Sequence, residues 1–204
     1  GHHGGLLTEA DEANIENRGR LYMWMRDVVD ITRPKVFIAE NVKGLVSLSN
    51  VKQIIEEDFR RIGGNGYVVV SARVLHAANY GVPQTRERVI FYGFRRDALK
   101  PAALKALTSE QVPKEYDPYP LPTHESAPGL ILNGLLPVVT VGEALADLPE
   151  PEMAKDESQK WFSKAKYYGR GLQGQTEVDL DGPGPTIRAE HHGNIEFRRL
   201  GKNH

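Results

Sequence analysis

The sequence contains no cysteine, and this absence excludes several kinds of chemistry at once. Among its 204 residues none is cysteine, so the chain can form no disulfide, hold no metal through thiolates and supply no thiol nucleophile. Long hydrophobic runs are also missing, because no apolar stretch approaches the roughly 20 residues that a membrane-spanning helix needs. No signal-peptide pattern opens the chain. These absences predict a cytoplasmic protein without a membrane partner.

An excess of one charge is missing as well. The 26 basic and 27 acidic residues give a net charge of -1, so any nucleic-acid site would have to be a local basic patch. The opening "GHHGG" fits either a tag remnant or native sequence cut from a longer protein. Its two histidines are too few to hold a structural metal ion. We therefore expect no metal.

Hydrophobic periodicity predicts helices that alternate with strands in the first half of the chain. A helix is predicted from Asn17 to Pro34, and a strand follows at 36–39, apolar on both faces as in a parallel sheet. The apolar stripe expected on that helix is Leu21, Trp24, Met25, Val28 and Val29.

A second helix is predicted after Asn50, which is a candidate N-cap with Gln53 three residues later. Gly63 and Gly64 would end this helix. The residues of its apolar stripe are Val51, Ile55, Phe59 and Ile62. Two β-branched runs, 67–75 and 88–94, then predict strands that pair in an antiparallel manner across a short link.

These elements predict an α/β fold with three domain-level segments. Residues 1–96 would form part of a catalytic domain. Residues 97–139 are rich in proline and predict an irregular connection, followed by a short helix in "TVGEALADLP" that Thr140 and Glu143 would cap. This connecting segment would span 97–149, and residues 150–204 would form a small separate region.

Glu40 and Asn41 follow a buried strand, and that position is where α/β folds place ligand sites. A carboxylate there can be partly desolvated, which would let it hold or donate a proton near neutral pH. A solvated turn is the alternative interpretation of "AEN". Further along, Arg86 and Arg88 are two residues apart and would face one side of a strand, with Glu87 on the other. Paired arginines suit an anionic or hydrogen-bond-accepting ligand, and a salt-bridged strand edge is the alternative.

Taken together, "RPKVFIAENVKGL" and "VLHAANYGVPQTRERVIFYGF" closely resemble motifs of the cytosine-C5 DNA methyltransferase family. The resemblance runs from about residue 17 to residue 96, and several motifs come in the family's order. It implies the C-terminal half of a Rossmann-like, S-adenosylmethionine-dependent methyltransferase fold, with parallel strands and a terminal antiparallel strand. Part of a small DNA-recognition region would follow.

The resemblance also implies roles for individual residues. Glu40 matches the catalytic glutamate at N3 of a flipped cytosine, Arg88 the arginine near O2, and Arg86 its companion beside the DNA backbone. Leu21 matches a position that borders S-adenosylmethionine, whereas Asn41 and Val42 would shape the base pocket. The remaining residues expected to contact DNA are Gln84, Lys160, Lys164, Lys166, Arg170 and Arg188.

The chemistry of the family accounts for these residue types. A cysteine thiolate adds to carbon 6 of cytosine and makes carbon 5 nucleophilic toward the cofactor's methyl group. Negative charge develops on the ring in that step, so a proton-holding glutamate at N3 and an arginine near O2 stabilise it. The base must first leave the duplex.

The sequence departs from the family pattern at three points. The Pro-Cys motif, the Gly-rich cofactor motif and the final Asn-containing motif are all missing. We therefore expect a fragment that is inactive alone, with an incomplete cofactor site, whose partners are double-stranded DNA and the missing N-terminal part of the enzyme. The parent would be a bacterial enzyme of the cytoplasm or nucleoid, in a restriction-modification system.

Other interpretations remain open on the sequence alone. The chain could be a non-catalytic DNA-binding or regulatory module, or one subunit of a split methyltransferase. "KWFSKAKYYGRG" interleaves cations with aromatics, as nucleic-acid sites do, but a small core with solvated lysines has the same pattern. A different Rossmann-like transferase would place the arginines far from Glu40.

Overall fold

The chain consists of two compact units. The computed structural model describes residues 21–47, 50–125, 134–149, 153, 155–157 and 178–186. The sheet unit comprises residues 1–75 and 87–120, and the second unit comprises 76–86 and 121–204. The structure therefore groups residues 97–120 with the sheet, whereas the sequence analysis placed them in a connecting segment.

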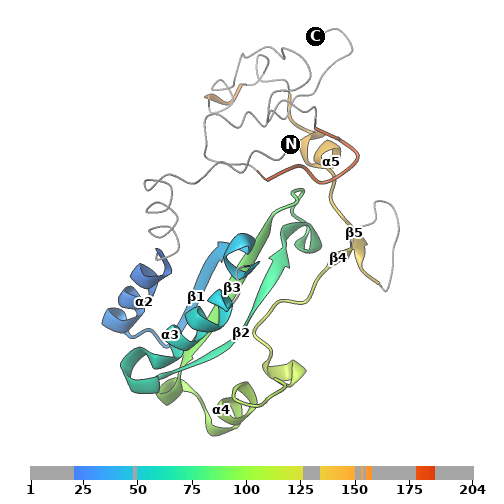
Figure 1. Cartoon of the computed structure of the whole chain (residues 1–204). Coiled ribbons are helices and arrows are strands. Elements are labelled where there is room, and N and C mark those ends of the chain that lie inside the picture. The colour runs from blue at the N-terminus through green and yellow to red at the C-terminus, as the bar shows by residue number, and fades with distance from the viewer. Residues whose placement is uncertain are drawn as a thin grey trace, which may run out of the picture. The chain divides into compact units, whose positions relative to one another are not determined.

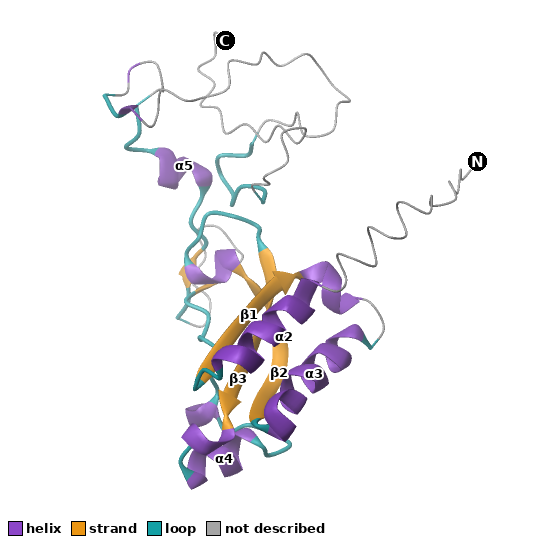
Figure 2. Ribbon diagram, turned by 90° about the vertical axis from the view of Figure 1, so that its left-hand side faces the viewer, coloured by secondary structure: helices purple, strands orange, loops and turns teal. Residues whose placement is uncertain are grey.

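A three-stranded sheet forms the centre of the sheet unit (Figure 1). Its strands are β1 (Val36–Val42), β2 (Tyr67–His76) and β3 (Glu87–Arg95), in the spatial order β1-β3-β2. Helices α2 (Leu21–Thr32) and α3 (Val51–Asn65) lie side by side against one face of the sheet (Figure 2). Helix α4 (Pro101–Leu107) follows β3.

The central strand β3 is antiparallel to both of its neighbours. It pairs with β1 from Val36 opposite Phe94 to Val42 opposite Arg88. Toward β2, the Arg96 amide donates to the Gly66 carbonyl, so the end of β3 meets the start of β2. The two outer strands therefore run parallel to each other, as the resemblance implied, and the predicted antiparallel pairing of β2 and β3 is confirmed.

The main core lies between the sheet and the two helices. Helix α3 buries Ile55, Phe59 and Ile62, so its predicted apolar stripe is confirmed. The Phe59 ring packs 4.8 Å from Phe37 of β1 and 6.2 Å from Phe91 of β3, centroid to centroid. Glycines end the helix as predicted, because Gly63 and Gly64 both adopt positive φ angles.

Two details of the predicted helices are wrong. Helix α2 buries Val29 and packs Tyr22 and Met25 against the core, whereas Trp24 and Val28 of the predicted stripe are exposed. Asn50 has a left-handed backbone with no side-chain cap bond, so the capping box predicted for α3 does not form. The rotation of α2 about its axis exposes Trp24 and Val28, whereas Asn50 occupies the N-cap position of α3 but does not use its side chain there.

A second cluster covers part of the opposite face of the sheet. Val68 and Val70 of β2 pack there with Leu107 and Tyr119, and the Tyr119 hydroxyl donates to the carbonyls of Ser71 and Ile90. Tyr119 and α4 lie in the segment predicted to be irregular. Proline at the first position of α4 and the following "AALKAL" were the signals for this helix.

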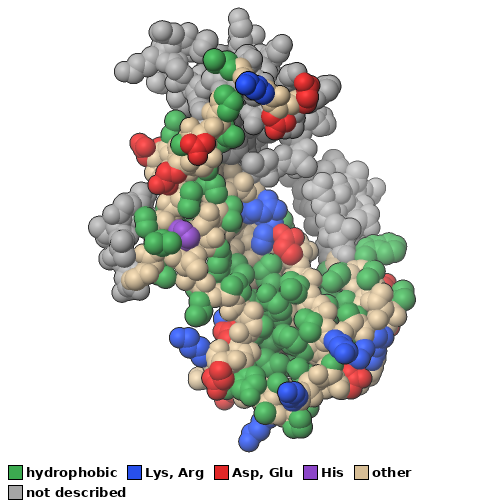
Figure 3. Space-filling model, turned by 180° about the vertical axis from the view of Figure 1, so that it is seen from behind, with side chains coloured by type: hydrophobic (Ala, Val, Ile, Leu, Met, Phe, Trp, Pro, Cys, Tyr) green, Lys and Arg blue, Asp and Glu red, His purple; other side chains and the backbone are tan. Residues whose placement is uncertain are grey.

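The same face remains open over β1. Val36 is 48% exposed and Ile38 is 55% exposed, so the prediction of a strand buried on both faces is wrong for the described residues. Figure 3, which views the molecule from behind, shows hydrophobic side chains gathered over its lower body. No described strand pairs with the outer edge of β1.

The second unit is built from short elements. Strands β4 (His124–Glu125) and β5 (Leu136–Pro137) pair in parallel, and helix α5 (Val141–Leu145) follows. The predicted capping box of α5 is confirmed, because the Thr140 hydroxyl accepts the Glu143 amide and the Glu143 carboxylate accepts the Thr140 amide. The hydrogen bonds that the Thr140 amide and hydroxyl donate to the Glu143 carboxylate lower the pKa of that group. None of the described helices has the length and apolar character to cross a membrane.

Gly93 is the point where β3 allows the closest approach of an aromatic ring. A Cβ atom added there would lie 2.0 Å from Cε1 of Phe37, which is 5% exposed and held against Phe59 and Tyr67. We expect Gly93→Ala to lower the free energy of unfolding by about 1–3 kcal/mol, because the buried ring has no room to move. Urea denaturation measures the change.

Gly44→Ala is the matched control, since no atom lies within 4 Å of its added Cβ and its φ angle is not positive. Equal unfolding midpoints for the two variants would contradict the packing of Phe37 on Gly93.

Candidate active site

Glu40 and Arg88 form an ion pair across β1 and β3. Glu40 lies opposite Ile90, and Arg88 lies opposite Val42, so the two charged residues are diagonal neighbours in the ladder. The Nε of Arg88 is 2.6 Å from Oε1 of Glu40. The structure thus brings together two residues that are far apart in the sequence.

A second contact fixes the guanidinium of Arg88. Its Nη1 donates to the main-chain carbonyl of Glu87 at 2.8 Å. The side chain of Arg88 is 22% exposed and that of Glu40 is 51% exposed. About half of the Glu40 side chain is therefore accessible, and it can be reached by a ligand.

The two faces of the sheet separate the predicted site residues. Side chains alternate along a strand, so Glu40 and Val42 share one face of β1 and Asn41 lies on the other. The Asn41 side chain accepts a hydrogen bond from the Val42 amide at 2.8 Å. Of the two residues predicted for the base pocket, only Val42 is on the face of Glu40 and Arg88.

A hollow of about 270 Å³ is lined by residues of β1, α2 and α3. Glu40 and Asn41 of β1 both border it, together with Tyr22 and Met25 of α2 and with Ile55 and Phe59 of α3. The Tyr22 hydroxyl donates to Asp58 at 2.8 Å, and burial together with this bond raises the pKa of Tyr22. Helix α2, which borders the hollow, begins at Leu21.

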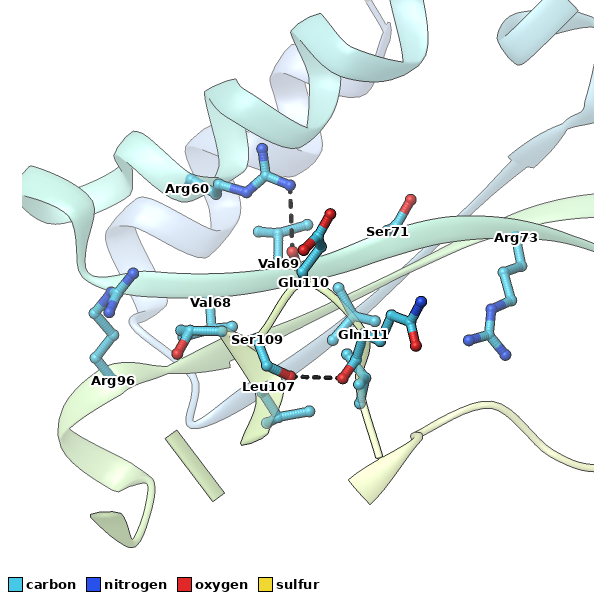
Figure 4. Close-up of a pocket in the computed structure, with 13 residues that line it drawn as sticks. Arg60, Val68, Val69, Ser71, Arg73, Arg96, Leu107, Ser109, Glu110 and Gln111 are labelled. Atoms are coloured by element: carbon cyan, nitrogen blue, oxygen red, sulfur yellow. Dashed lines mark hydrogen bonds between the residues drawn. The ribbon is translucent and has the colours of Figure 1, made fainter. Parts of the chain in front are cut away.

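A larger hollow, of about 600 Å³, lies along β2, and Glu40 is not among the residues that line it (Figure 4). Arg60, Arg73 and Arg96 line it, but Arg60 is paired with Glu56 and Arg73 with Asp117. The dashed contacts in Figure 4 are internal, from Arg60 to the Val69 carbonyl and from Ser109 to the Gln111 carbonyl. None of the residues proposed from the sequence lines this hollow, and its size alone does not make it the site.

Arg86 and Gln84 belong to the second unit. Gln84 bridges to Gly184 in parallel, and the Thr85 amide donates to the Gly184 carbonyl at 2.7 Å. The Arg86 carbonyl accepts the Ala77 amide at 2.7 Å. The segment that precedes β3 therefore forms hydrogen bonds with Gly184, a residue about one hundred positions later in the sequence. The roles predicted for Arg86 and Gln84 in DNA contact stay predictions.

Several predicted residues lie outside the described part of the chain. These are Lys160, Lys164, Lys166, Arg170 and Arg188, together with the opening histidines and the side chain of Leu21. The described residues contain no group of three or more histidine, aspartate or glutamate side chains arranged to hold a metal ion.

The sequence analysis gave no role to Lys43, although it follows the "ENV" motif directly. Its Nζ lies 2.9 Å from both carboxylate oxygens of Glu87. The opposite charges of Lys43 and Glu87, which lie at the two predicted motifs, were the only sequence signal for this contact. The paired register of β1 and β3, which places them together, was not predictable from the sequence.

Comparison with known proteins gives one consistent result. A profile of the C-5 cytosine-specific DNA methylases matches residues 10–191. The Type II methyltransferase M.NgoFVII of Neisseria gonorrhoeae is 37% identical over 134 residues, which is 65% of this chain and 30% of that protein.

Two further relatives match over more of the chain. The Type II methyltransferase M.XorII of Xanthomonas oryzae pv. oryzae is 32% identical over 87% of this chain and 36% of its own length. The Type II methyltransferase M.BsuRI of Bacillus subtilis is 30% identical over 92% of this chain and 38% of its own length. The chain thus spans between 30% and 38% of the length of these three curated relatives.

Proposed function

Because the chain belongs to the C-5 cytosine-specific DNA methylase family, we propose that it supplies the base-binding part of a DNA methyltransferase. The enzyme would transfer a methyl group from S-adenosylmethionine to carbon 5 of a cytosine flipped out of duplex DNA. A bacterial restriction-modification system in the cytoplasm is the proposed setting, in keeping with the Type II relatives.

The contact between Glu40 and Arg88 is the observation that carries this proposal. An arginine bound to a half-exposed carboxylate places a cation and a group that can accept a proton within one hydrogen-bonded distance of each other. Glu40 would hold a proton at N3 of the cytosine, and Arg88 would stabilise charge that develops near O2. The 2.6 Å separation supports the proposal, because a different Rossmann-like transferase would place Arg86 and Arg88 far from Glu40, and Arg88 is in contact with it.

The described residues fit only part of an S-adenosylmethionine site. This cofactor, when bound, supplies the methyl group. The hollow beside α2 has mainly apolar walls and about 270 Å³ of space, whereas sites for ligands of that size usually occupy about 300–1,000 Å³. Tyr22, Met25 and Asn41 would border one portion of the cofactor, and Leu21 would adjoin them in sequence.

The remaining proposed contacts concern DNA. Arg86 and Gln84 would lie along the backbone near the flipped base. Extraction of the base costs a few kcal/mol of unstacking, and contacts to phosphates help to offset that cost. Lys160, Lys164, Lys166, Arg170 and Arg188 would supply further contacts to DNA.

The proposal is tested by a chimera that adds the parts of a relative that this chain does not span. The matched region of M.NgoFVII is replaced with the aligned part of this chain, and the rest of that enzyme is retained. The purified chimera is incubated with S-adenosylmethionine and bacterial DNA that lacks modified bases. Nucleoside mass spectrometry of the digested DNA should then show 5-methylcytosine. Methyl groups on adenine, on the exocyclic nitrogen of cytosine, or on no base with a folded chimera would contradict the proposal.

The chain by itself should transfer no methyl group, because it contains no cysteine to form the thiolate. The measurement is incorporation of labelled methyl from S-adenosylmethionine into duplex DNA by the 204-residue protein. Incorporation above that of a protein-free control would refute the assignment of the nucleophile to a cysteine. A chimera that binds DNA without any transfer would favour the DNA-binding module instead.

A further inference from the structure

Lys43 and Glu87 form a second ion pair at the same end of β1 and β3. The Lys43 ammonium lies 2.9 Å from each oxygen of the Glu87 carboxylate. Lys43 comes directly after β1, and Glu87 is the first residue of β3. Since Val42 is opposite Arg88, the next step along the ladder places Lys43 opposite Glu87.

The two ion pairs join the strands from opposite faces. Val89 and Phe91 belong to the main core under α2 and α3, whereas Ile90 and Tyr92 pack in the second cluster. By strand alternation Glu87 is on the side of the main core and Arg88 on the other. The paired end of β1 and β3 is therefore bridged on both faces of the sheet. The contact between Glu40 and Arg88 bridges one face, and the contact between Lys43 and Glu87 bridges the other.

The main chain of Glu87 connects the two pairs. Its carbonyl accepts the hydrogen bond from Nη1 of Arg88, while Nε of Arg88 contacts Glu40. A guanidinium is planar with its donors in a fixed geometry, so these two anchors define the plane of the group. The position of the Glu87 carbonyl thus determines where the remaining donors of Arg88 point.

We propose that Lys43 and Glu87 are positioning residues that hold the guanidinium of Arg88 in place. Their ion pair keeps the first residue of β3 paired with the end of β1, and strand ends without such a contact fray. The role of Arg88 toward a cytosine rests on the proposed function, whereas the effect of the ion pair on Arg88 does not. The pair is exposed, with side-chain exposures of 52% and 37%, so stability is a poor measure of its role.

The test follows Arg88 directly in the 204-residue chain. Lys43→Met and Glu87→Gln are compared with the unmodified protein by the hydrogen-exchange rate of the Arg88 Nε–H group, measured by NMR. We expect both variants to raise this rate two- to fivefold, which corresponds to about 0.4–1 kcal/mol for a cross-strand charge pair. The charge-exchanged double variant Lys43→Glu with Glu87→Lys should return the rate toward the original value.

Asp97→Asn is the matched control, because it removes the Arg95–Asp97 ion pair at the other end of β3. Its Arg88 rate should not change. An unchanged rate in both Lys43→Met and Glu87→Gln would overturn the proposal, as would an equal increase in Asp97→Asn. Because this readout needs no methyl transfer, its outcome is separate from that of the chimera.

Activity of the chimera gives a second readout of positioning. If Arg88 acts mainly on the transition state, Lys43→Met should lower kcat two- to fivefold with little change in the KM for DNA. A rise in KM alone would show that the pair contributes to DNA binding and not to the position of Arg88.

Discussion

Glutamine in place of Glu40 should lower the rate of methyl transfer by the chimera about 10²- to 10⁴-fold, the range for loss of a general acid or base. The amide retains the size of the side chain, but it cannot hold a transferable proton. Arg88 also loses the carboxylate that lies 2.6 Å from its Nε. The loss should appear in kcat, because the charge on the ring develops only as the reaction proceeds.

Single-turnover methyl transfer with saturating DNA measures this effect. Glu57→Gln is a suitable control, because Glu57 is a partly exposed glutamate of α3 that pairs with Arg61. A rate for Glu40→Gln within about threefold of the control would be far below the general acid–base range. Glu40 would then serve only as a strand-edge ion-pair partner, which was the alternative interpretation for the arginine cluster.

Alanine in place of Phe59 should lower the free energy of unfolding by about 3–5 kcal/mol. The side chain is 1% exposed, and its ring packs between Phe37 and Phe91. The loss is large against the total of about 5–15 kcal/mol that small proteins possess. Phe59 also lines the hollow beside α2, so the variant would deform that surface as well.

Trp24→Ala is the informative control for this prediction. The sequence pattern put Trp24 on the buried stripe of α2, but the structure leaves it 73% exposed. Its replacement should change stability by no more than about 0.5 kcal/mol. Guanidinium denaturation of the 204-residue chain compares the two. A loss at Trp24 equal to that at Phe59 would show that α2 presents its other side to the core.

The contrast between α2 and α3 shows when hydrophobic periodicity is sufficient to predict which side of a helix is buried. In α3 the apolar residues Ile55, Phe59 and Ile62 define a narrow stripe with charged residues around it, so only one orientation buries them. Helix α2 has apolar residues over a wider arc, and several rotations would bury some of them. The contact with α3 selects the side that carries Tyr22, Met25 and Val29.

The sequence identified the two central residues of the site but not their arrangement. "AENVK" and "QTRER" resemble family motifs, and that resemblance pointed to Glu40 and Arg88. It did not show that Arg88 contacts Glu40, or that Lys43 contacts Glu87. Both contacts depend on the register of β1 against β3, which pairs residues nearly fifty positions apart.

The sequence by itself determined the order of helices and strands from α2 to β3, the antiparallel pairing of β2 and β3, and the absence of a thiol. These properties follow from local patterns of apolar residues, glycines and prolines, and from composition. Only the tertiary structure decided which side of α2 is buried, that α4 and Tyr119 pack on the sheet, and that two ion pairs hold one junction of β1 and β3 from its two faces. The physical reason is that burial and ion pairing depend on surfaces supplied by segments far away in the sequence. A local sequence pattern contains no information about which of these surfaces will pack against a given helix or strand.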